Sequence, residues 1–152
     1  EDQAEDDLPV MSAASVQAAL RALAPLAPCT TNMVLVMSDA DVMERQGAGM
    51  LTALAHGFSH LQHLELDGGP VLSPTFWSVL QPRLPCLHTL TLTSTDEVDT
   101  GALSVFAATA QRPMLVEFCC VRDEVWWPVQ DMMDEMREEG VTSVVTVTRC
   151  SK

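Results

Sequence analysis

The sequence predicts an α/β fold, a short solenoid of about five strand–helix units with a parallel sheet on one face and helices on the other. The first observation is a repeated motif: residues 61–66 follow the pattern L-x-x-L-x-L, and residues 87–92 repeat it. The second is that an apolar helical stretch precedes each copy. A motif that returns at a fixed period indicates stacked units of one kind.

Three further copies are weaker but keep a similar spacing. They begin at Met33, Leu115 and Val141, so the intervals between successive copies are nearly equal along the chain. Residues three apart share a helix face, which predicts an apolar stripe on each helix that packs on the back of the sheet. Pairs at matching distances before the first four copies fit this stripe: Leu23 and Leu26 precede the copy at Met33, and the pairs before the next three copies are Leu51 and Leu54, Trp77 and Leu80, Val105 and Ala108.

Over roughly residues 30–150 this pattern resembles the longer, helix-containing leucine-rich repeat, similar to ribonuclease-inhibitor-type repeats. Where that family usually carries Asn or Cys, eight positions after the first leucine, this chain has Asp41, Gly69, Thr95 and Asp123. The resemblance implies a non-enzymatic scaffold that binds a protein on its concave sheet face. Such domains serve as substrate-recognition arms, for instance in F-box proteins, or as subunits of large assemblies. A compact doubly wound sheet is the alternative, because spacing alone leaves open whether helices cover one face or both.

Composition favours an intracellular domain whose acidity is compatible with a basic protein partner, although solubility alone is the simpler explanation of that acidity. The 152 residues suit one domain, and a hydrophobic content of 47% suffices for a core. A net charge of −13 argues against nucleic acid, because phosphate binding needs a basic surface. Five irregularly spaced cysteines predict reduced thiols in the cytoplasm or an organelle interior rather than a secreted disulfide framework. No apolar run reaches membrane-spanning length, and no motif implies a cofactor.

The start of the chain has its own character. It shows neither an initiator methionine nor a signal peptide, so we expect a processed product or an excerpt of a longer protein. Residues 1–7 carry five acids and no base. This predicts a flexible acidic tail over residues 1–12, followed by the leucine-rich-repeat-like domain at residues 13–152.

The first half of this domain is expected to hold two helices around an unusually apolar strand. Ser12 or Ser15 caps a helix that runs to about Leu26, where prolines follow. The strand at residues 33–37 is apolar at nearly every position, so either both of its faces are covered or its outer face meets a partner. A glycine-weakened helix is expected at residues 40–58.

Caps and breakers delimit the elements of the second half. Ser73 caps a helix that ends at the prolines from Pro82 onward. A short helix follows at residues 100–110, and a longer one runs from Glu124 until Gly140 ends it. A final strand rich in Val and Thr is expected at residues 141–147.

Alternation of side chains within the strands predicts one exposed sheet face that binds the partner. If Leu61, Leu64 and Leu66 point inward, the residues between and after them point outward, and later copies behave alike. The predicted partner-binding residues are His63, Glu65, Asp67, Thr89, Thr91, Thr93, Glu117 and Cys119, with Val121 after them. Acids with only one histidine as a counter-charge predict a partner segment rich in Lys or Arg. The alternative is that threonines and acids simply suit a solvated face.

A different function could rest on Asp39 and Asp41. This D-x-D resembles the metal-binding motif of haloacid-dehalogenase-like phosphatases and of nucleotide-sugar glycosyltransferases, where carboxylates at a strand end hold Mg²⁺. The Gly-Thr that usually follows the phosphatase motif is replaced by Val42-Met43, and no downstream lysine or acidic pair completes the set. Acids near the positive end of a helix are the simpler interpretation, so we predict neither an enzyme nor a metal site.

Histidines and cysteines support two minor hypotheses. His56 and His60 have the spacing of zinc ligands on a helix face, but His63 lies on a predicted strand, so surface histidines are expected instead. Cys29 and Cys86 each follow a proline just before a strand, where we expect buried thiols.

Trp126 and Trp127 form the most unusual dipeptide of the chain. Neighbours on a helix diverge by about 100°, so one ring is expected to pack inward while the other is at least partly exposed. Exposed tryptophan is enriched at binding hot spots, but a ring lying flat on its own domain is the alternative.

Because no completing ligands are evident, we expect Asp39 and Asp41 not to bind Mg²⁺ tightly. Isothermal titration of the full chain with Mg²⁺ should show no stoichiometric binding at micromolar concentration. Micromolar binding that disappears in Asp39→Asn would favour the enzyme over the scaffold.

Overall fold

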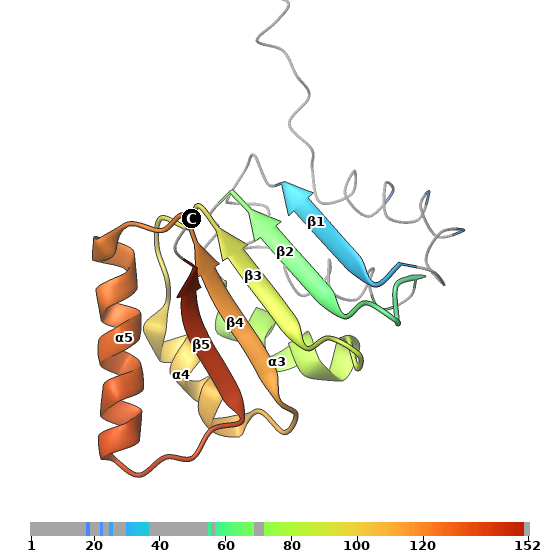
Figure 1. Cartoon of the computed structure of the whole chain (residues 1–152). Helices are drawn as coiled ribbons and strands as arrows, with labels where there is room; N and C mark the ends of the chain where they lie inside the picture. Colours follow the sequence, from blue (N-terminus) through green and yellow to red (C-terminus); the bar gives the residue numbers. More distant parts are fainter. Residues whose placement is uncertain are drawn as a thin grey trace, which may run out of the picture.

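A five-stranded parallel sheet organises the fold, and its strands pair in chain order, β1-β2-β3-β4-β5 (Figure 1). The computed structural model describes residues 30–36, 57–68 and 72–150, with single positions 18, 22, 25 and 55. The strands are β1 (Asn32–Val36), β2 (His63–Asp67), β3 (Thr89–Thr93), β4 (Met114–Cys119) and β5 (Val145–Cys150). The described helices with bounds are α3 (Pro74–Arg83), α4 (Thr100–Thr109) and α5 (Asp123–Glu138). The predicted α/β class with five parallel strands is therefore confirmed.

The crossovers place α3 and α4 on the same face of the sheet, with α5 beside α4 near the β5 edge (Figure 1). A strand–helix–strand crossover is almost always right-handed, so successive crossovers in one direction put their helices on one side. None of the helices among the described residues combines the length and the apolar content that a membrane crossing requires.

Local sequence signals begin the helices. The Ser73 hydroxyl accepts a hydrogen bond from the backbone N–H of Phe76 at 3.2 Å, and Asp99 caps α4 through the N–H of Ala102 at 3.0 Å. The predicted cap at Ser73 is thus confirmed. Pro82 does not end α3 as expected but lies inside its last turn, and the helix continues to Arg83.

The central repeat packs as its leucines predict. Leu64 and Leu90 are fully buried, and they are register partners on the adjacent parallel strands β2 and β3. Trp77 and Leu80 of α3 are buried behind them. These residues belong to one apolar core between the sheet and the helices, which confirms the inward register predicted for the two best copies.

The copy of the motif that begins at Leu115 is displaced by two positions from its predicted alignment. Val116, not Phe118, is the register partner of Leu90, and Leu115 lies beside Thr89 on the other face. Pro113 occupies the position equivalent to Leu87. Because it is not a leucine, an alignment on leucines starts this copy two residues later, at Leu115. Only the last two positions of the pattern are kept, as the buried Val116 and Phe118, because burial there needs an apolar side chain rather than a leucine, whereas Pro113 is exposed.

This displacement also corrects the helix prediction. Val105 is 62% exposed and Ala108 is exposed, whereas Leu103 and Phe106 are buried in their place. With this correction the buried pair recurs at one constant interval from α3 to α4 and from α4 to α5. The three helical pairs are Trp77 and Leu80, Leu103 and Phe106, Val129 and Met132.

The two edge strands are displaced from their predicted register by three positions. Met33 pairs with Leu64, and Val147 pairs with Val116. More residues separate Met33 from Leu64, and Val116 from Val147, than separate Leu64 from Leu90 or Leu90 from Val116. An odd displacement exchanges the two faces. Accordingly Val144, predicted inside, is 43% exposed, and Val145 is buried.

The final strand starts later than predicted, at Val145 rather than Val141. The helical pairs keep their constant interval into α5, so the additional chain follows Met132: α5 extends further past its buried pair than α3 and α4 do, and the loop before β5 is also longer. On β1 the outward Val34 is 58% exposed. The tail at residues 1–12 falls outside the described residues, as do nearly all of the helices predicted at 15–26 and 40–58.

Leu64→Ala should lower the free energy of unfolding by about 2–5 kcal/mol, because it leaves a cavity in the centre of the core. Val34→Ala on the neighbouring strand is the matched control and should cost within about 0.5 kcal/mol, since that side chain is mostly exposed. Urea unfolding monitored by tryptophan fluorescence measures both. Equal effects of the two substitutions would contradict the assigned register.

Candidate binding surface on the sheet

The sheet face opposite α3 and α4 carries a compact set of polar side chains, here called the polar sheet face. In one row Glu65, Thr91 and Glu117 are register partners on β2, β3 and β4. The structure places all eight predicted partner-binding residues on this face: His63, Glu65, Asp67, Thr89, Thr91, Thr93, Glu117 and Cys119. The alternation of strand side chains produces this grouping.

Hydrogen bonds between strands hold several of these side chains in place. The Thr91 hydroxyl donates to Glu117 Oε1 at 3.4 Å and contacts His63 Nε2 at 2.8 Å. A hydroxyl has one proton, so the His63 ring is the donor in the shorter bond. Thr93 donates to Glu65 Oε1 at 3.0 Å. Thr91 is only 4% exposed, so its hydroxyl fixes a histidine and a carboxylate on either side of it.

The acids of this face have no cationic partner among the described residues. Glu65, Asp67 and Glu117 are half-buried. The salt bridges of the described residues all lie elsewhere: Arg122 with Asp96, Arg137 with Asp134, and Arg149 with Asp123. Threonine hydroxyls orient Glu65 and Glu117 without neutralising them, so the polar sheet face keeps a concentrated negative charge.

Two residues near the end of β4 differ from the prediction. Val121 was expected on the exposed face but is 7% exposed, and Leu115 takes a place on that face instead. Strand alternation places Cys119 outward and so predicts an inward Cys120, but Cys120 is exposed and leaves the strand with a positive φ of 54°. The chain turns at this point, so the alternation of the strand no longer applies to either residue.

The cysteines differ in their surroundings. Burial, together with the neighbouring Cys150 thiol and the Glu117 carboxylate, raises the pKa of the Cys119 thiol to about 12. Cys86 was expected to be buried but is exposed, and Cys29 lies outside the described residues. The described residues contain no group of three or more metal-ligating side chains. Asp39, Asp41 and His56 are not among them.

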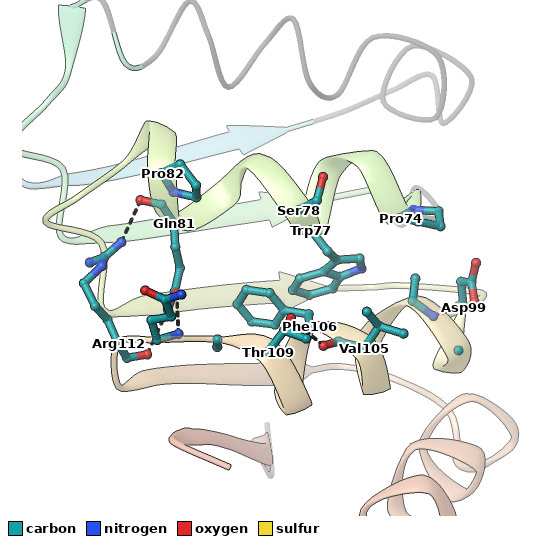
Figure 2. Close-up of a pocket in the computed structure, with 14 residues that line it drawn as sticks. Pro74, Trp77, Ser78, Gln81, Pro82, Asp99, Val105, Phe106, Thr109 and Arg112 are labelled. Atoms are coloured by element: carbon teal, nitrogen blue, oxygen red, sulfur yellow. Dashed lines mark hydrogen bonds between the residues drawn. The ribbon is translucent and has the colours of Figure 1, made fainter.

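A groove between α3 and α4, on the opposite side of the sheet, was missed by sequence reasoning. It encloses about 630 Å³, and Figure 2 shows side chains from both helices along it. The rings of Trp77 and Phe106 form its floor, with their centroids 5.0 Å apart. Both occupy the repeated buried helical positions, which is the signal that could have placed them together.

Hydrogen bonds close one end of this groove. The Arg112 guanidinium donates to the backbone carbonyls of Gln81, Leu84 and Pro85, at the end of α3. The Gln81 side chain in turn bonds the Arg112 carbonyl and the Gln111 N–H (Figure 2). These polar groups are satisfied within the protein, so the groove offers mainly apolar contact, including the exposed Val105.

The two tryptophans of α5 divide as predicted. Trp126 is 7% exposed and packs on Phe118, with ring centroids 6.0 Å apart, whereas Trp127 is 56% exposed.

Comparisons of the chain with protein-family models, with curated proteins and with solved structures found no match.

The alkylation rates of the thiols test the difference in burial between Cys119 and Cys86. Near neutral pH, Cys119 should react with iodoacetamide at least about tenfold more slowly than Cys86, because the thiolate is the nucleophile and the Cys119 pKa is raised. As pH rises from about 7 to about 9, its rate should increase roughly tenfold per unit, since the thiolate fraction does so below the pKa.

Quantitative mass spectrometry of the alkylated peptides measures these rates. Unfolding in urea is the control and should make the thiols react alike. Rapid labelling of Cys119 in the folded protein would show that its environment is not the buried one described.

Proposed function

We propose that this chain is a non-enzymatic, leucine-rich-repeat-like scaffold whose polar sheet face binds a basic segment of a protein partner. The observation that carries the proposal is the group of carboxylates on that face, Glu65, Asp67 and Glu117, which have no salt-bridge partner among the described residues. Pairing of the strands in chain order and the constant interval between the buried helical pairs support the repeat architecture.

The polar character of the sheet face favours a binding role. Parallel sheets are usually covered on both faces, and their strands then read as continuous apolar runs. Here β2 and β3 alternate between buried leucines and polar residues such as Glu65 and Thr93. Repeat proteins are the architectures in which an open parallel sheet serves as an extended binding surface.

Charge complementarity specifies the partner. A negative patch accelerates encounter with a Lys- or Arg-rich segment, and this effect weakens as salt screens the charges. The oriented threonine hydroxyls supply hydrogen-bonding groups between the carboxylates. Val34, the exposed register partner of Glu65, adds an apolar contact at the β1 edge. The expected segment is therefore basic with at least one apolar side chain.

The test is a double charge reversal, Glu65→Lys with Glu117→Lys, assayed with a fluorescent peptide of alternating lysine, arginine and leucine. Fluorescence anisotropy at about 50 mM and about 300 mM salt should show binding by the parent chain that weakens with salt. The double variant should bind at least about tenfold more weakly at low salt, because two attractive contacts become repulsive.

Glu135→Lys with Glu138→Lys is the matched control. It makes the same change of net charge on α5, away from the polar sheet face. An equal loss of affinity in both double variants would show that binding depends on net charge alone and not on the polar sheet face. Unchanged affinity and salt dependence in the folded Glu65→Lys, Glu117→Lys variant would reject the polar sheet face as the binding surface.

A further inference from the structure

We propose that Cys119 and Cys150 are a redox modification site: a dithiol pair that closes to an intramolecular disulfide by exchange with a small-molecule disulfide such as oxidised glutathione. The pair lies at the carboxyl ends of β4 and β5, whose arrowheads are adjacent in Figure 1. This inference is independent of the partner proposed above.

The strand register brings the two thiols together. Cys119 and Cys150 are direct register partners in the parallel pair of β4 and β5, so both side chains leave the same face of the sheet. Neighbouring strands lie about 4.8 Å apart, which falls within the range of about 4.4–6.8 Å between the Cα atoms of disulfide-bonded cysteines. The Cys150 thiol is one of the groups that raise the pKa of the Cys119 thiol, as expected for side chains that lie close together.

The fold also makes the pairing selective. Cys120 follows the end of β4 and is exposed, with a positive φ that turns the chain away from the strand path. Cys86 precedes β3, at the other end of the parallel strands from Cys119. Among the described cysteines, only Cys119 and Cys150 share a row of the sheet.

The exchange proceeds in two balanced steps. The Cys150 thiol is the more accessible of the two, so its thiolate attacks one sulfur of the small disulfide and releases the first small thiol. The Cys119 thiolate then attacks the Cys150 sulfur, breaks the mixed disulfide and releases the second small thiol. Two protein thiols are oxidised, one small disulfide is reduced, and the two thiol protons end on the released small thiols.

The buried surroundings favour retention of this bond. A disulfide is a strong oxidant when the thiolate that its reduction produces is stabilised. The raised pKa of Cys119 shows that its thiolate is destabilised, so this disulfide should be a weak oxidant. The cross-link encloses α5 and joins the edge strand β5 covalently to β4. Oxidation should therefore suppress local opening of β5 and slow exchange of its backbone amide hydrogens.

The test compares the folded full chain after incubation with dithiothreitol or with oxidised glutathione. Intact mass under non-reducing conditions should fall by about 2 Da on closure, as expected when two thiols lose their hydrogens. Digestion should then yield the peptide containing Cys119 linked to the peptide containing Cys150. Hydrogen exchange of β5 should slow at least about threefold in the oxidised form.

Four single variants locate the bond, and thermal unfolding verifies that each is folded. Cys119→Ser and Cys150→Ser should abolish the mass loss, whereas Cys86→Ser and Cys120→Ser should retain it. Cys119→Ser should instead accumulate a stable glutathione adduct on Cys150, because the resolving thiol is absent. A cross-link that survives in folded Cys119→Ser, or only glutathione adducts in the parent chain, would overturn the proposal.

Discussion

The stacking of Leu64, Leu90 and Val116 on adjacent parallel strands holds the sheet and its helices in a common register. These side chains are fully buried, so a slip of one position would move them into water and bring polar groups into the core. The cost of that exchange, several kcal/mol for each leucine, specifies the pairing. The buried helical pairs then follow, because each helix packs on strands whose positions are already determined.

The polar sheet face is a consequence of the same stacking. Once Leu64 and Leu66 point to the helices, Glu65 must point away from them, and its neighbours on β3 and β4 are Thr91 and Glu117. The hydrogen bonds that Thr91 and Thr93 donate orient the carboxylates of Glu117 and Glu65 on this face. The apposition of Cys119 and Cys150 arises in the same way, one row further along the strands. The two proposed activities therefore share one structural origin without depending on each other.

The edges of the sheet obey looser constraints than its centre. The interval between strand partners is the same from β2 to β3 as from β3 to β4, but it is longer at both edges of the sheet. In α5 the pair Val129 and Met132 nevertheless keeps the helical interval, so the additional chain follows Met132, in a longer end of α5 and in the loop before β5. A helix end or a loop tolerates such an insertion at little thermodynamic cost, whereas an insertion before or within the buried part of an element would displace its buried face.

The amino-acid sequence by itself determined the α/β class, the inward leucines of β2 and β3, the cap at Ser73 and the division of Trp126 and Trp127. Each of these depends on a local period or a local hydrogen bond. Tertiary structure decided the alignment of β4, where a displacement by two positions keeps the alternation of the faces and so leaves little trace in the pattern. It also decided the edge strands, because consecutive apolar residues such as Val144 and Val145 fit either face equally well. The Thr91 hydrogen bonds, the groove between α3 and α4 and the pairing of Cys119 with Cys150 join residues distant in sequence. Such contacts exist only once packing selects one register among those that the local pattern allows.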